Sequence, residues 1–160
     1  AIGAYYANKD KTIVLIDGDG SFQMNIQELA TIASNRIPIK MFVINNGLWG
    51  LPMQWHEMFD RGNLFECCLD RDISCPVGCS SFKDCIKRNR NPDLIGLREV
   101  YRGIKTNRIS RAEEITPAIK EVLSHEGPYI LDVEIKKESF ILPIIPPGKG
   151  IEEMIIERKT

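Results

Sequence analysis

Three short apolar runs, each bounded by polar or turn-forming residues, dominate the pattern of the chain. They cover Thr12–Ile16, Ile39–Ile44 and Tyr129–Ile135 and are rich in β-branched residues. Runs of this length and composition predict strands of a parallel sheet, and the first is apolar enough to be buried on both faces. A shorter fourth strand is predicted at Ile104–Ile109.

Apolar residues recur at helical spacing between these runs. One predicted helix follows the first run, and another begins at Ser110, where Ser110 and Glu113 have the spacing of a capping box. Pro117 conflicts with the second helix, so either that helix kinks or Thr116 is a second N-cap. The two predicted buried stripes are Phe22, Ile26, Leu29, Ala30 and Ala33, and Ile115, Ala118, Ile119, Val122 and Leu123. Shorter helices are predicted near residues 2–6, 52–59, 92–101 and 152–157.

Strands that alternate with helices predict an α/β fold with three layers, in which helices cover both faces of a mostly parallel sheet. We interpret residues 1–160 as one domain that is incomplete at its N-terminus, because the chain begins inside a helical pattern. Residues 63–90 hold all five cysteines and little periodicity, which predicts an exposed insertion. Residues 141–160 begin with a Pro- and Gly-rich stretch and form a C-terminal tail.

Composition excludes several classes of protein. The 160 residues are 43% hydrophobic and 27% charged, which is typical of a globular domain. A net charge of −1 gives no reason to expect a nucleic-acid or membrane partner, and no apolar run has the length of a membrane span. Five cysteines cannot form a complete disulfide framework, which favours a reducing compartment such as the cytoplasm. Their irregular spacing makes zinc a much weaker hypothesis than reduced thiols.

Two polar signatures follow the first two apolar runs. Gly18-Asp19-Gly20-Ser21 follows the first run and Asn45-Asn46 follows the second, with 24 residues between Gly20 and Asn45. That separation accommodates a helix and a return crossover, so both signatures should leave the sheet at the same edge. Ligands bind at that edge in open α/β sheets.

The residue types in these signatures suit a diphosphate held through a metal ion. The glycines permit a tight turn, and the helix that follows favours an anion at its N-terminus. Asp19 would repel a bare phosphate, but a bridging Mg²⁺ takes carboxylate, amide and phosphate oxygens. Asn46 supplies the amide oxygen. The alternative is that Gly18-Asp19-Gly20 is only a turn with no ligand. Two other phosphate-binding motifs, the dinucleotide fingerprint and the Walker lysine, are not present.

Taken together, the two signatures resemble the motif of thiamine-diphosphate enzymes, in which Gly-Asp-Gly is followed at this separation by Asn-Asn. More narrowly, the stretch GDGSFQMNIQELATIASNRIPIKMFVINN resembles the large (catalytic) subunit of acetolactate synthase. The similarity covers nearly the whole chain, with a gap at the cysteine segment. It continues in Gly50, Gln54-Trp55, Asn91-Pro92-Asp93, Gly127-Pro128 and the tail LPIIPPGKGIEEMI.

The resemblance implies that thiamine diphosphate and Mg²⁺ are the cofactors. It implies Asp19, the Asn46 side chain and the Leu48 carbonyl as metal ligands, and a lid formed by the tail. The remaining implied site residues are Gly18, Gly20 and Ser21 at the diphosphate, Gly50 and Leu51 in a region that packs on the cofactor, and Trp55 in the substrate channel. The chain departs from the family in Leu51-Pro52, which replace Met-Val, in an extra residue at Arg102, and in the cysteine insertion.

The resemblance also implies a reaction, the decarboxylation of pyruvate followed by ligation to a second 2-oxo acid. In this family a glutamate from another domain, across a subunit interface, activates the cofactor. It follows that N-terminal domains and a homodimer partner are missing, and we assign no catalytic residue here. Glu28 fits a surface role, and His125 is predicted to complement a helix dipole. The alternatives are another thiamine-diphosphate decarboxylase or carboligase, or a catalytically silent, truncated binding module.

Overall fold

The computed structural model describes residues 1–59, 92–136 and 141–157. The chain divides into two compact units. The first, which we call the sheet unit, comprises Ala1–Gly47 and Asn91–Ile135, and the second, the α4 unit, comprises Leu48–Arg90 and Lys136–Thr160. The predicted cysteine insertion at 63–90 lies outside the described residues, and the extent of the domain stays a prediction.

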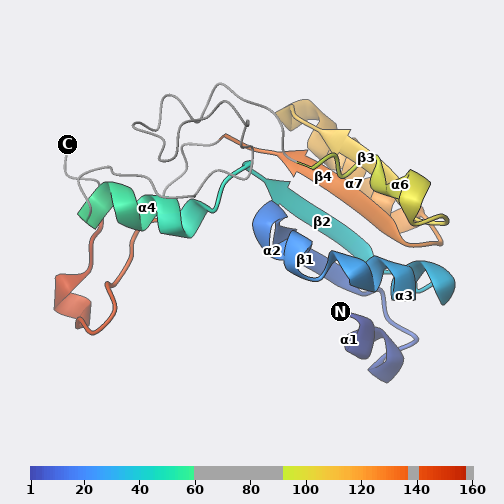
Figure 1. Ribbon diagram of the computed structural model, residues 1–160, viewed down its shortest axis with the longest axis horizontal. Helices are drawn as coiled ribbons and strands as arrows, with labels where there is room; N and C mark the ends of the chain where they lie inside the picture. Colours follow the sequence, from blue (N-terminus) through green and yellow to red (C-terminus); the bar gives the residue numbers. More distant parts are fainter. Residues whose placement is uncertain (60–91, 137–140, 158–160) are drawn as a thin grey trace. The chain divides into compact units, whose positions relative to one another are not determined.

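The sheet unit contains a four-stranded sheet in the order β1-β2-β4-β3, and every neighbouring pair is parallel (Figure 1). This arrangement confirms the predicted α/β fold. The strand ends lie close to the predicted ones, and both β1 and β2 extend into the polar signatures that follow them. The strands are β1 (Val14–Gly18), β2 (Lys40–Asn45), β3 (Lys105–Ile109) and β4 (Tyr129–Glu134).

Helices cover both faces of this sheet, as predicted (Figure 1). The crossover from β1 to β2 runs in the opposite direction along the sheet from the crossover between β3 and β4. Right-handed crossovers in opposite directions place their helices on opposite faces. The helices of the sheet unit are α1 (Ile2–Ala7), α2 (Asp19–Met24), η1 (Ile26–Glu28), α3 (Leu29–Ser34), α6 (Leu97–Val100), η2 (Ala112–Glu114) and α7 (Ile115–Ser124).

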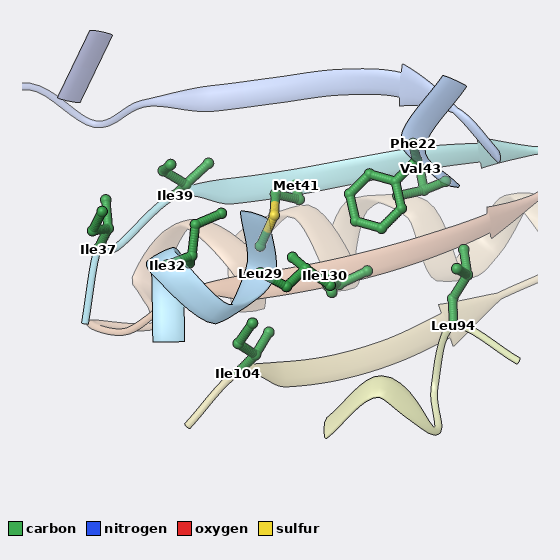
Figure 2. Packing of buried hydrophobic residues seen from close by; sticks show 10 residues of the cluster. All are labelled: Phe22, Leu29, Ile32, Ile37, Ile39, Met41, Val43, Leu94, Ile104 and Ile130. Carbon is green, nitrogen blue, oxygen red and sulfur yellow. The ribbon is translucent and has the colours of Figure 1, made fainter. Parts of the chain in front are cut away.

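Each face of the sheet has its own apolar core. Figure 2 shows side chains of α2 and α3 packed over β2 and β4, with Ile130 of β4 in this larger core. The next residue, Leu131, points the opposite way into the core under α7. The larger core comprises Phe22, Leu29, Ile32, Ile37, Ile39, Met41, Val43, Leu94, Ile104 and Ile130.

The prediction that the first strand is buried on both faces is wrong. Val14 is 45% exposed and Ile16 is 71% exposed, whereas Leu15 packs against the larger core. The core under α7 takes its strand residues from β2, β3 and β4, so within the described residues no helix packs on this face of β1. An apolar run therefore predicted the strand correctly but not its environment.

The single helix predicted after β1 is divided into α2, η1 and α3. The division follows Asn25, after which a 3₁₀ turn rotates the chain further per residue than an α-helix does. The buried face of the helices therefore differs from the predicted stripe. Ile32, which the stripe did not include, is buried, and Ala30, which it included, is exposed.

The predicted capping box is displaced by one residue, and it begins η2 rather than α7. Glu114, rather than Glu113, accepts hydrogen bonds from the backbone N–H groups of Ser110 and Arg111, each 3.0 Å long. Thr116 is not a second N-cap, because α7 begins at Ile115, and Pro117 falls in the first turn of α7, where its missing N–H costs little.

The α4 unit consists of α4 (Gly50–Phe59) and the tail, which contains η3 (Ile151–Glu153). The buried side chain of Gln54 binds the tail at two points. Its Nε2 donates to the Ile141 carbonyl at 3.0 Å, and its Oε1 accepts from the Ile141 N–H at 2.8 Å. Over the described ranges, no helix combines the length and apolar character needed to cross a membrane.

A polar cluster lies where the strands begin. Lys40 is only 3% exposed, and its Nζ donates to the carbonyl oxygens of His125 and Gly127 at the end of α7. Burial and the nearby charges of Lys40 and Lys105 lower the pKa of His125, which disfavours the charged form that the predicted dipole role needs. Lys40 supplies the positive charge at that position instead.

Tyr129 belongs to the same cluster, and its contacts lead us to expect that the protein loses stability at high pH. Its hydroxyl donates to Glu121 Oε1 at 3.0 Å, and burial together with Glu121 raises its pKa from 10.0 to about 12. The stability that this group contributes is complete below pH 10 and is lost as the pH rises through its folded-state pKa. The unfolding free energy of the wild type should therefore fall by roughly 2 kcal/mol more than that of Tyr129→Phe over this range. Urea denaturation at several pH values, with Tyr101→Phe as the control, measures this difference. An unfolding free-energy difference that does not change with pH would contradict it.

Candidate functional site

The two polar signatures leave the sheet side by side. β1 and β2 are parallel neighbours, and Gly18 at the end of β1 is in register with Ile44 on β2. Asp19 and the Asn45-Asn46 pair therefore follow adjacent strand ends at the carboxyl edge of the sheet. This is the shared edge that the spacing of the signatures predicts.

A hydrogen bond joins the two signatures directly. Asp19, the first residue of α2, is only 2% exposed, and its Oδ2 accepts from the backbone N–H of Gly47 at 3.1 Å. Gly47 has a φ of 68°, a left-handed conformation that glycine adopts without strain. The sequence analysis did not assign a role to Gly47, although a glycine directly after Asn-Asn is the signal that could have indicated it.

A network of polar side chains continues from this bond into the sheet. Gly47 N–H also donates to Asn45 Oδ1 at 3.1 Å, and Asn45 Nδ2 donates to Asp132 Oδ1 at 2.9 Å. Asp132 is fully buried on β4, and its Oδ2 accepts from Arg108 Nε on β3 at 2.8 Å. Sequence reasoning missed both Asp132 and Arg108. The signal for Asp132 was a carboxylate that interrupts an apolar run before Glu134, at the end of the strand.

The residues around Asp19 leave room for a ligand. A Cβ added at Gly18 would meet no atom within 4 Å, so the backbone at the end of β1 can be approached closely. Gly20 is buried in α2 and Ser21 is exposed at its surface. Because α2 has only six residues, its N-terminal dipole alone attracts an anion weakly. A cation is therefore the more important means of holding a diphosphate here.

The chemistry of the donor set fits Mg²⁺. Asp19 offers a carboxylate and Asn46 an amide oxygen, and both are hard ligands that this ion prefers. Within the described ranges, no three His, Cys, Asp or Glu side chains gather as a metal site. A metal ion beside Asp19 would therefore take further oxygens from the backbone and from phosphate, which is how Mg²⁺ is commonly held with phosphate ligands.

The other predicted site residues belong to the α4 unit. Leu48 is its first residue, and Gly50 and Leu51 begin α4. Trp55 lies on α4 and stacks on Phe59 with ring centroids 4.7 Å apart. The roles of these residues stay predictions.

Comparisons with known proteins identify the family. Residues 1–133 match the family model described as thiamine pyrophosphate enzyme, C-terminal TPP binding domain. The chain is 36% identical over 157 residues to acetolactate synthase 2, chloroplastic, of Zea mays, and this match covers 98% of the chain and 23% of that protein. It is 32% identical over 155 residues to acetolactate synthase isozyme 2 large subunit of Escherichia coli K12, covering 97% of the chain and 25% of that protein.

Solved structures share the fold. A thiamine diphosphate-dependent 4-hydroxybenzoylformate decarboxylase of Rhodococcus jostii RHA1 matches with a TM-score of 0.66 and 24% identity, over 85% of this chain and 22% of that one. Benzoylformate decarboxylase of Polynucleobacter necessarius matches with a TM-score of 0.65 and 22% identity, over 89% of this chain and 23% of that one. The chain spans at most a quarter of these relatives' lengths. It belongs to the thiamine pyrophosphate (thiamine diphosphate) enzyme family, through that family's C-terminal cofactor-binding domain.

Proposed function

We propose that this chain holds thiamine diphosphate through a Mg²⁺-bridged diphosphate, as part of an enzyme of the acetolactate synthase type. The observation that supports this best is the 3.1 Å hydrogen bond between Asp19 and the Gly47 N–H. It brings the Gly-Asp-Gly turn against the Asn-Asn turn, so that the carboxylate and amide oxygens that suit Mg²⁺ lie on neighbouring strand ends.

Each site residue has a proposed role in binding. Asp19, the Asn46 side chain and the Leu48 carbonyl ligate the metal ion. When bound, thiamine diphosphate supplies the reactive carbon, while the protein orients it and sets its electrostatic surroundings. The remaining proposed contacts are Gly18, Gly20 and Ser21 with the diphosphate, Gly50 and Leu51 with the cofactor, and Trp55 with the substrate.

The reaction proposed for the complete enzyme is decarboxylation of pyruvate and ligation to a second 2-oxo acid. Because the chain spans at most a quarter of its relatives, we propose that additional N-terminal domains and a homodimer partner supply the catalytic glutamate. The chain alone is then expected to bind cofactor without turnover. The odd number of cysteines favours a reducing compartment, for which we propose the cytoplasm.

A second candidate is another thiamine-diphosphate decarboxylase or carboligase. The names of both structural relatives, which are decarboxylases of aromatic 2-oxo acids, favour it. A third is a silent binding module. Assays of the full-length protein with pyruvate and with benzoylformate would distinguish the three. The first proposal predicts ligation of decarboxylated pyruvate to a second 2-oxo acid, the second predicts decarboxylation or ligation with a different acceptor, and the third predicts no turnover.

Calorimetry tests the proposed cofactor site. Thiamine diphosphate should bind the purified protein in the presence of Mg²⁺, and binding should weaken at least about 100-fold when EDTA removes the ion, since a carboxylate then faces a diphosphate. Thiamine, which lacks the diphosphate, should bind no better with Mg²⁺ than without it. Affinity for thiamine diphosphate that does not depend on Mg²⁺ would refute the metal-bridged site.

A further inference from the structure

We propose that Asp132 is a positioning residue for the cofactor site: it orients Asn45, and through Gly47 this orientation holds Asp19 ready to receive the Mg²⁺-diphosphate. The inference deepens the proposed function and rests on it. It assigns a role to a buried carboxylate that is not among the proposed metal ligands.

Strand register places Asp132 between its two partners. Asp132 on β4 is in register with Val43 on β2 and with Arg108 on β3. Paired residues of neighbouring strands point to the same face, and so do alternate residues along one strand. Asn45, two positions after Val43, therefore shares the face of Asp132, and the carboxylate lies between Arg108 and Asn45.

The carboxylate determines which way the Asn45 amide points. An ionised carboxylate only accepts hydrogen bonds, so the atom of Asn45 that faces Asp132 Oδ1 at 2.9 Å must be the nitrogen. The amide oxygen then faces the Gly47 N–H at 3.1 Å. A flipped amide would place oxygen against carboxylate and leave an NH₂ group against the Gly47 N–H. Asp132 thus excludes the wrong orientation.

The Gly47 N–H transmits this orientation to the proposed ligands. It is shared between Asn45 Oδ1 and Asp19 Oδ2, each at 3.1 Å. Asn46 lies between Asn45 and Gly47, so both of its chain neighbours are held by the same network. Asp19 and Asn46 are therefore fixed in place before a cofactor arrives, which lowers the entropic cost of binding.

Arg108 joins the network through ion pairs. Its guanidinium binds Asp132 through Nε at 2.8 Å and the exposed Asp93 through Nη2 at 3.0 Å. Charge-assisted bonds of this kind are stronger and more directional than neutral ones. Apolar residues often replace a buried ion pair without loss of stability, so stability alone gives little reason for a carboxylate at this position. Orientation of Asn45 gives a specific reason.

A double-mutant cycle tests the proposal. In Asp132→Leu, exchange of the Gly47 amide hydrogen in the cofactor-free protein should accelerate about tenfold, and affinity for thiamine diphosphate with Mg²⁺ should fall about tenfold. In an Asn45→Leu background, the same Asp132→Leu change should have little further effect on the exchange rate or the affinity. The Asn45 side chain through which Asp132 is proposed to act is already absent in that background. A purely structural role predicts equal losses in both backgrounds and would overturn the proposal.

Two further variants complete the test. Arg108→Met with Asp132→Asn offers Asn45 an NH₂ group as well as an oxygen, so it no longer excludes the flipped amide, and affinity should fall by about threefold or more. If Asp132→Leu does not fold, wild-type affinity in this double variant would overturn the proposal. Asp93→Asn, at an exposed partner of Arg108, should change neither quantity. If the wild type itself binds no thiamine diphosphate, the proposed function fails. If it binds and Asp132→Leu binds equally well, only this inference fails.

Discussion

Arg108→Met should lower the free energy of unfolding by about 3 kcal/mol, because it leaves a buried carboxylate without its charged partner. Asp132 is fully buried, and Arg108 Nε lies 2.8 Å from its Oδ2. The hydrogen bond from Asn45 remains, but a neutral amide cannot replace a guanidinium in the protein interior. Urea denaturation followed by circular dichroism measures the loss.

A matched arginine provides the control. Arg98 is paired with Glu99 at 3.1 Å, but their side chains are 54% and 77% exposed. Surface pairs of this kind contribute little, so Arg98→Met should change the free energy of unfolding by less than about 0.5 kcal/mol. Adding Asp132→Asn to Arg108→Met should recover much of the loss, because the unpaired charge is then absent. Equal destabilisation by the two arginine variants would show that burial of Asp132 is not the cause.

Features that depend on residues close together in the sequence were predictable. The runs before Asp19 and before Asn46 have the length and β-branched content of buried strands. Their separation accommodates a helix and a return crossover between parallel strands, which places both signatures at one edge. The structure confirms that edge through the register of Gly18 with Ile44. The chemistry of the site followed from the residue types at that edge.

Features that depend on which strands become neighbours were not predictable. Asp132 meets Arg108 and Asn45 because β4 lies between β3 and β2, an order that no local pattern specifies. Asn45 and Asp132 are separated by 87 positions in the sequence, and so are Gln54 and Ile141. The exposed faces of Val14 and Ile16 have a similar origin, since an apolar run does not reveal whether a helix will cover it.

Asp19→Ala should weaken binding of thiamine diphosphate with Mg²⁺ by at least about 100-fold, because it removes both a proposed metal ligand and the acceptor for the Gly47 N–H. Asp19→Asn separates these two contributions. The amide oxygen of this variant can still accept a hydrogen bond from the Gly47 N–H, while the loss of the negative charge should lower the affinity for Mg²⁺. Calorimetry of both variants across a range of Mg²⁺ concentrations measures the effect.

Glu28→Gln is the control for charge alone. Glu28 is exposed on η1, where its Oε2 accepts from the Thr31 hydroxyl at 3.2 Å. This variant changes the net charge by the same amount as Asp19→Asn, and it should bind with unchanged affinity because a solvated charge interacts weakly at a distance. If Asp19→Asn and Glu28→Gln bind alike, net charge rather than ligation governs affinity, and Asp19 is not a metal ligand. If Asp19→Asn alone loses affinity and high Mg²⁺ partly restores it, the carboxylate acts through the metal ion, and Asn46 and the Leu48 carbonyl are the next ligands to test.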